Sequence, residues 1–187
     1  MRLFVALEIP SAVRENLAAF LDSLRGISKE PRWVRPGNLH VTLKFLGEVE
    51  EAKVAAIRNA LKEMRCEQAI KLNFRCLGFF PNEKHPRVFW AGIEASANLK
   101  ILATDIDGAM DKLGIPREQR PFSAHLTLAR FERPGLSEAL RKAIATNMER
   151  DFGSLRTNEF HLIQSKLNPS GAQYTTLASF PFATAEA

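Results

Sequence analysis

Residues 39–46, LHVTLKFL, have the pattern of a buried strand, but a histidine and a threonine stand two residues apart inside it. Residues 124–129, AHLTLA, repeat this pattern. The second histidine follows the first by 85 residues (125 − 40), and the two threonines have the same spacing. By chance, His-x-Thr-Leu occurs on the order of once per ten thousand positions, so two copies in one short chain indicate an internal repeat.

The segments around the two motifs follow one another in a similar order. Each half of the chain has the patterns of a helix, a loop, the His-x-Thr strand, a second helix and two strands. The expected helices cover residues 11–26, 50–64, 96–114 and 136–148, and the expected strands cover residues 2–9, 39–47, 70–80, 87–95, 124–131, 154–167 and 174–182. The strand at residues 2–9 has no evident counterpart in the second half, and its partner strand stays open.

This order predicts an α+β fold with mostly antiparallel sheets, because strand pairs follow one another without intervening helices. A repeat of 85 residues is too long for a solenoid unit and indicates two similar lobes related by a pseudo-twofold axis. We expect residues 1–187 to form a single two-lobed domain with approximate half-repeats 1–95 and 96–187, and with an active-site cleft between the lobes.

Composition is typical of a soluble globular protein, with 45% hydrophobic and 25% charged residues. We expect no membrane span, because no long uncharged apolar run is present. The first apolar run is short and is interrupted by Glu8 and Pro10, unlike that of a signal peptide. Cys66 and Cys76 fit reduced thiols better than a disulfide framework. We therefore expect a cytoplasmic protein, and a monomer.

The net charge of +5 and the pI of about 9.5 favour a polyanionic partner. No block of like charge marks a nucleic-acid-binding tail, so on charge alone a merely basic soluble protein fits as well as an RNA- or DNA-binding one.

The motif residues suit phosphodiester chemistry. Side chains alternate between the faces of a strand, so His40 and Thr42 share one face, as do His125 and Thr127. If the lobes face each other, one imidazole can take a proton from an attacking water or hydroxyl while the other protonates the leaving oxygen. Each threonine hydroxyl can donate to a non-bridging phosphate oxygen. This logic does not decide which histidine is the acid.

Arg130 follows Thr127 by three residues and, on strict alternation, lies on the opposite face. It either reaches a phosphate at the strand end, where a guanidinium fits well, or pairs with a carboxylate, and both readings stay open. The same alternation places Lys44 on the face of His40 as a weaker phosphate candidate.

Two aromatic residues are candidates for stacking on an RNA base. We expect Phe45 to pack in the core and Trp33, which lies in a loop with two arginines, to be more open. His85 and His161 lie outside the repeated motifs, so we expect structural roles for both. No metal is expected, because no metal-ligand spacing of His, Cys, Asp and Glu is visible.

The motifs HVTL and HLTL resemble the paired His-x-Thr-x motifs of the 2H phosphoesterase superfamily. The flanking segments resemble one branch of it, the RNA 2′,3′-cyclic phosphodiesterases, also called 2′-5′ RNA ligases. This likeness extends nearly end to end, over MRLFVALEIP, RWVRPGNLHVTLKFLGEV, PRVFWAGI, RPFSAHLTLARF and FHLIQSKLNPSGAQYTTLASFPF. Ser123-Ala124 and the segment LIQSKL depart from the usual family sequence, but neither touches a motif position.

The resemblance implies a two-lobed α+β fold without metal or nucleotide cofactor. It implies hydrolysis of a 2′,3′-cyclic phosphate on an RNA end to a 2′-phosphate, with His40 as proton donor to the 3′ oxygen and His125 as proton acceptor from water. The ligase name implies the same chemistry run in reverse, joining RNA ends such as tRNA half-molecules through a 2′-5′ linkage without ATP. Two alternatives stay open: a 2H enzyme acting on a small cyclic nucleotide or an ADP-ribose cyclic phosphate, and a non-catalytic RNA-binding module.

Overall fold

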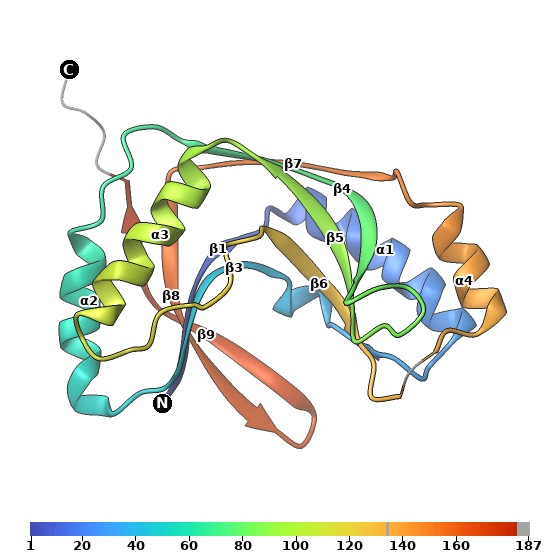
Figure 1. Ribbon diagram of the computed structural model, residues 1–187, viewed down its shortest axis with the longest axis horizontal. Coiled ribbons are helices and arrows are strands. Elements are labelled where there is room, and N and C mark those ends of the chain that lie inside the picture. Colours follow the sequence, from blue (N-terminus) through green and yellow to red (C-terminus); the bar gives the residue numbers. More distant parts are fainter. Residues whose placement is uncertain (134, 183–187) are drawn as a thin grey trace.

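Within residues 1–133 and 135–182, which the computed structural model describes, the strands form two antiparallel sheets (Figure 1). The first sheet has the strand order β3 (His40–Glu48), β1 (Arg2–Glu8), β8 (Glu159–Asn168) and β9 (Gly171–Pro181). The second has the order β2 (Arg32–Trp33), β6 (His125–Arg130), β5 (Val88–Ala95), β4 (Ile70–Phe80) and β7 (Asp151–Thr157). The expected α+β class with antiparallel sheets is confirmed.

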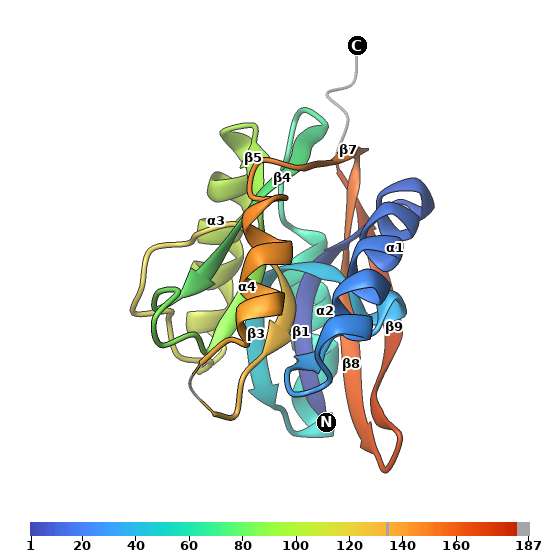
Figure 2. The ribbon, with the colours of Figure 1, turned by 90° about the vertical axis from the view of Figure 1, so that its right-hand side faces the viewer.

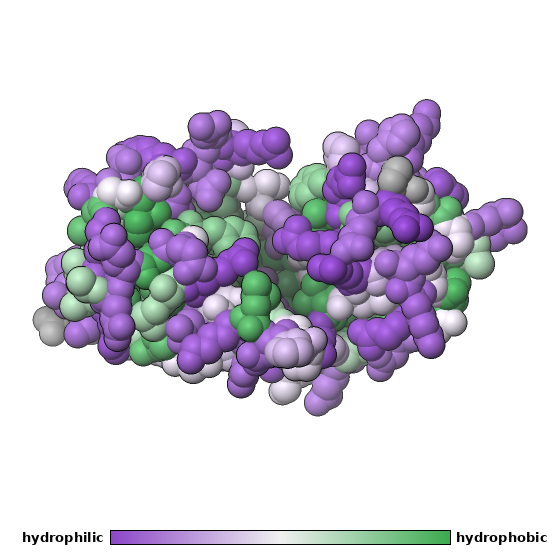
Figure 3. All heavy atoms as spheres, turned by 90° about the horizontal axis from the view of Figure 1, so that it is seen from below, coloured by the Kyte–Doolittle hydropathy of each residue, from purple (hydrophilic) through white to green (hydrophobic). Residues whose placement is uncertain are grey.

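Helices cover the outer sides of the two sheets. Their bounds are α1 (Ser11–Ile27), α2 (Val54–Lys62), α3 (Asn98–Asp111) and α4 (Glu138–Ala145), with short 3₁₀ turns at η1 (Pro36–Asn38) and η2 (Glu51–Lys53). α3 packs on β3 with α2 beside it, whereas α1 packs on β7 with α4 beside it (Figures 1 and 2). Each helix buries one stripe, as the apolar spacing predicts; in α1 the stripe is Val13, Leu17, Phe20, Leu21 and Leu24. The resulting lobes lie side by side, and the surface is hollowed between them when seen from below (Figure 3).

The sequence halves interleave, so that each lobe takes elements from both. α1 belongs to the first half but covers the second sheet, and α3 belongs to the second half but covers the first sheet. β8 likewise returns to the first sheet and pairs with β1. The lobes are therefore not the two halves of the sequence, although the halves repeat.

The first strand has a counterpart in β5, which lies at the end of the approximate half 1–95 and not in the second half, where none was expected. β1 pairs with β3 as β5 pairs with β6, and each of these inner strands pairs on its other edge with β8 or β4. The 85-residue offset holds here too, since RLFVA at residues 2–6 matches RVFWA at residues 87–91. β5 is thus the equivalent of β1, and the motif strands β3 and β6 occupy equivalent places.

The strand expected at residues 154–167 is two strands. The chain bends at Asn158, where the Thr157 hydroxyl donates to the Glu159 carbonyl at 3.0 Å. β7, before the bend, belongs to the second sheet, and β8, after it, belongs to the first. Both pieces have strand-forming sequences, so the pattern alone could not mark the change of sheet.

Candidate active site

A β-bulge follows the threonine in the motif strand β3. The partners of Thr42 and Lys44 are neighbours in β1, so the intervening Leu43 has no partner there. One extra residue shifts the alternation of side chains by one position. Lys44 therefore turns into the interior, whereas Phe45 returns to the face of His40 and is 57% exposed. The expectation that Phe45 packs in the core was wrong for this reason. The Lys44 side chain does not lie open on the His40 face as expected, although Lys44 still lines the cavity next to His40.

The second motif strand has the same bulge. The partners of Thr127 and Ala129 are neighbours in β5, so Leu128 has no partner there. Arg130 consequently lies on the same side as Thr127, not on the opposite face as strict alternation predicts. The bulges repeat at the same 85-residue offset, so Arg130 is the positional equivalent of Phe45.

A cavity of about 290 Å³ between the two sheets collects the motif residues. The two histidines, the two threonines and Arg130 all line it, as does Lys44, the weaker phosphate candidate; the five are His40, Thr42, His125, Thr127 and Arg130. Both histidines and both threonines are half-buried at its wall. Its size suits a phosphate with one attached nucleotide. Any longer chain attached to that nucleotide must lie on the surface, outside the cavity.

Several other residues of this wall were not expected from the sequence. They are Phe4, Asn38, Glu118, Phe122, Ser123 and Tyr174. Alternation of side chains along β1 places Phe4 on the same side as His40. This placement follows from the sequence only once β1 is known to pair with β3. Tyr174 comes from β9, which only the pairing of distant strands brings to the site.

Each histidine is held by the carbonyl two residues before it. His40 Nδ1 lies 3.0 Å from the Asn38 oxygen, and His125 Nδ1 lies 2.9 Å from the Ser123 oxygen. A carbonyl oxygen can only accept, so Nδ1 carries the proton in both rings. Nε2 of the neutral ring is then the basic nitrogen, and it is available for acid–base work.

The two imidazoles differ in their surroundings. Phe4 lies edge-on to His40 with ring centroids 6.1 Å apart, and Tyr174 lies at 5.4 Å. Burial lowers the pKa of His40, and the nearby charge of Arg14 adds to this against the opposing effect of the Asn38 carbonyl. His40 is therefore mostly neutral at pH 7 in the unliganded protein. His125 packs edge-on against Phe80 at 5.1 Å.

Trp33 does not contribute to the cavity wall, contrary to expectation. Its indole N–H donates to the Ser28 carbonyl at 2.9 Å, and its ring lies edge-on to Phe89. Of the two aromatic candidates, Phe45 is thus the one that a base can reach. His161 is buried, and its Nδ1 pairs with the Ser179 hydroxyl at 2.9 Å, consistent with a structural role.

Residues 1–133 and 135–182, which the structure describes, contain no cluster of three or more His, Cys, Asp or Glu side chains placed to hold a metal ion. The same residues include no helix with the length and apolar character needed to cross a membrane.

The chain matches the family model described as LigT like Phosphoesterase, once over residues 7–90 and again over residues 93–174. The double match agrees with the internal repeat.

The chain is also similar to curated proteins and solved structures. A protein of Archaeoglobus fulgidus, named RNA 2′,3′-cyclic phosphodiesterase, is 39% identical over 96% of this chain and 99% of its own length. A protein of the same name from Methanothermobacter thermautotrophicus is 32% identical over 96% of this chain and 98% of its own length.

Among solved structures, one from Thermus thermophilus superposes with a TM-score of 0.82 at 31% identity, covering 100% of both chains. The structure of E. coli LigT complexed with 3′-AMP superposes with a TM-score of 0.78 at 26% identity, covering 98% of both chains.

Proposed function

Because the chain belongs to the family of LigT-like phosphoesterases, we propose that it hydrolyses 2′,3′-cyclic phosphate ends of RNA to 2′-phosphates. The observation that carries this proposal is the convergence of two His-x-Thr pairs, one from each sheet, on one cavity. A phosphate between them meets an imidazole and a hydroxyl on either side. The names of the relatives, RNA 2′,3′-cyclic phosphodiesterase, support RNA as the substrate class.

In this mechanism His125 acts as the base and His40 as the acid. His125 Nε2 takes a proton from a water molecule, and the water oxygen attacks phosphorus. The P–O3′ bond breaks, and His40 delivers a proton from its Nε2 to the departing 3′ oxygen. The hydroxyls of Thr42 and Thr127 donate to the non-bridging oxygens as negative charge grows there. In these steps the protein supplies proton transfer and hydrogen bonds, and no metal ion takes part.

The lowered pKa of His40 fits a general acid that becomes protonated when the substrate binds. In the unliganded cavity the neutral ring prevails, because burial disfavours the cation. A bound phosphodiester places a negative charge beside the ring and favours the imidazolium. The proton is then present when the anionic substrate is bound.

Two further side chains serve substrate binding in this proposal. Arg130 lines the cavity on the side of Thr127, where its guanidinium can pair with a phosphate oxygen. Phe45 presents an exposed ring at the equivalent place on the other side, where the terminal base can stack.

The same groups can join RNA ends. If the 5′-hydroxyl of a second RNA replaces the attacking water, the product is a 2′-5′ linkage and no ATP is consumed. tRNA half-molecules are our proposed substrates for this reaction.

The test is incubation with an RNA oligonucleotide that ends in a 2′,3′-cyclic phosphate, with and without excess EDTA. We expect a 2′-phosphate product in both. A 3′-phosphate, or no product, contradicts the proposal, and loss of activity that magnesium or zinc restores contradicts its metal-independent mechanism. A matched assay with 2′,3′-cyclic AMP separates an RNA enzyme from one whose substrate is a small cyclic nucleotide.

A further inference from the structure

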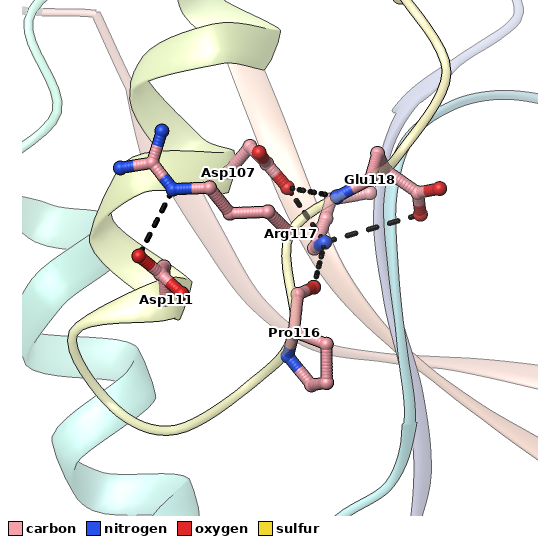
Figure 4. Close-up of polar contacts among 6 residues, drawn as sticks. Asp107, Asp111, Pro116, Arg117 and Glu118 are labelled. Atoms are coloured by element: carbon pink, nitrogen blue, oxygen red, sulfur yellow. Dashed lines mark hydrogen bonds and ion pairs between the residues drawn. The ribbon is translucent and has the colours of Figure 1, made fainter.

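The bulge in β3 places the ammonium group of Lys44 in the interior. The side chain is 1% exposed, and its Nζ lies 2.6 Å from Asp107 Oδ1 on α3 (Figure 4). Nζ also donates to the Pro116 carbonyl at 2.6 Å and lies 3.9 Å from Glu118 Oε1. The two close oxygens accept hydrogen bonds from the ammonium, and the Glu118 carboxylate adds a longer ion-pair contact, so the buried charge is compensated.

Stability alone does not account for this buried ion pair. Desolvation offsets most of the attraction in such pairs, and apolar replacements are often neutral or stabilising. The repeat supplies a comparison, because Ala129 occupies the equivalent position in β6. A bulged motif strand therefore does not require a cation at this place.

Lys44 holds the segment that leads into the second His-x-Thr motif. Residues 115–124 connect α3 to β6, and Lys44 contacts their first turn through Pro116. In the same turn the Glu118 amide donates to Asp107 at 3.1 Å, and Arg117 pairs with Asp111 at 2.9 Å (Figure 4). The first half of the segment is thereby fixed to both β3 and α3.

Asp107 is suited to this role because it stays ionised. Burial by itself would raise the pKa of its carboxyl, but the hydrogen bonds from Lys44 and from the Glu118 amide outweigh burial and hold the pKa below its usual value.

The second half of the segment belongs to the cavity. Pro121, Phe122 and Ser123 line it, and the Ser123 carbonyl accepts the hydrogen bond from His125 Nδ1 at 2.9 Å. That carbonyl fixes which ring nitrogen carries the proton and how the ring is turned. The position of the segment therefore affects the proton acceptor of the proposed reaction.

We propose that Lys44 is a positioning residue, which anchors residues 115–124 through Pro116 and Asp107 and so fixes the tautomer and orientation of His125. Lys44 lies two residues after Thr42, so the anchor ties the first motif strand to the approach of the second. The anchored segment then runs from the first lobe to the second, since α3 packs on the sheet of β3 and β6 belongs to the other sheet. The catalytic part of this inference rests on the proposed function.

The test compares Lys44→Met with the control Leu46→Ala. Methionine fills a similar volume without the charge, and Leu46 is a buried residue on the same strand face that carries no polar group to hold the segment. We expect kcat of Lys44→Met to fall about tenfold or more, since small misplacements of catalytic groups have effects of this size. KM should change much less, because the substrate-contacting residues remain. Leu46→Ala should lose stability but keep kcat when assayed well below its melting temperature.

A second measurement, NMR of the imidazole ¹⁵N and Cε1–H signals, does not depend on turnover. We expect Lys44→Met to change the tautomer signature of His125 and leave that of His40 as in the parent. This result would uphold the anchor even if the parent failed to cleave the cyclic RNA, in which case only the proposed function would fail. Unchanged His125 signals in Lys44→Met would overturn the proposal, as would the same change in Leu46→Ala.

Asp107→Asn covers the case in which Lys44→Met does not fold. The amide keeps the shape and an acceptor oxygen but weakens the anchor. We expect the same change in the His125 signals at smaller size, and unchanged His125 signals would count against the anchor.

Discussion

The motif strands β3 and β6 are equivalent in backbone but differ in their surroundings. Each carries a histidine whose Nδ1–H is held by the carbonyl two residues earlier, and each bulges directly after the threonine. Beyond the bulge they diverge: Lys44 and Phe45 on β3 correspond to Ala129 and Arg130 on β6. The repeated backbone presents the same pair of groups twice, and the neighbouring side chains give the two pairs different surroundings.

The divergence extends to the rings themselves. His40 packs against both Phe4 and Tyr174, and burial lowers its pKa. His125 leans on Phe80, which is 38% exposed, and depends on the carbonyl of an anchored segment. A reaction that needs one acid and one base gains from this asymmetry, because two identical imidazoles would compete for the same proton.

The largest expected effect breaks the pair itself. His40→Ala and His125→Ala should each lower kcat by at least about a hundredfold, the usual lower scale for a general acid or base. The double variant should be little slower than either single one, because acid and base act as a unit. Steady-state kinetics of the three variants measure this, and near-parental turnover in either single variant refutes the two-histidine mechanism.

The pH dependence of the residual rates sharpens the assignment of roles. The parent should show a bell-shaped profile of kcat/KM whose two apparent pKa values belong to the pair. In His125→Ala the residual rate should fall as pH rises, because His40 must be protonated to act as an acid. In His40→Ala it should rise with pH. Exchange of these two limbs would make His40 the base.

Substitution of the two threonines tests a feature that both motif strands share. Thr42→Val and Thr127→Val keep the branched strand shape and remove the hydroxyl, so each should lose about 2–4 kcal/mol of transition-state stabilisation. In both variants the bell-shaped pH profile of kcat/KM should keep its two apparent pKa values and reach a lower maximum. A displaced limb at unchanged height would show that the hydroxyl tunes a histidine rather than binding phosphate.

Substitution of Phe45 and Arg130 tests a position at which the two motif strands differ, and we expect smaller effects on the kinetics. Arg130→Gln should lower kcat/KM about tenfold, the size of one charge-assisted hydrogen bond. Phe45→Ala should mainly raise KM, by the few-fold to tenfold that a stacking contact supplies. Kinetics on a cyclic-phosphate dinucleotide would measure both, and Phe45→Leu serves as control for apolar area without an aromatic face. A parental KM in Phe45→Leu would exclude stacking.

The smallest effect concerns stability. The pKa of His40 is lowered in the folded state, so the unfolded state binds more protons as pH falls through the ordinary histidine value of about 6.5. This group therefore makes folding less favourable toward acid, and the change levels off below its lowered pKa. Urea unfolding of the parent and of His40→Asn between neutral and mildly acidic pH measures it. The variant should show a weaker loss, and an equal loss would place the protonation elsewhere.

The sequence predicted the site better than the details of its strands. His40, His125 and the two threonines could be predicted because residue type and spacing carry the signal directly. The faces of Lys44, Phe45 and Arg130 could not, because a bulge changes the alternation and nothing in LHVTLKFL marks it. The segment of residues 154–167 illustrates a further limit, since β propensity does not say which sheet a strand joins.

The pairing of β1 with β8 has a consequence for the order in which the protein is made. Arg2 lies opposite Ser165, so β1 pairs with a strand that is made 163 residues (165 − 2) after it. Until then β1 offers an open edge, and contacts so distant in sequence form slowly. His40 lies on the neighbouring strand, beside Tyr174, and so acquires its surroundings only when β8 and β9 emerge. A nascent chain stopped after the second motif would carry both histidines but only part of the cavity around His40.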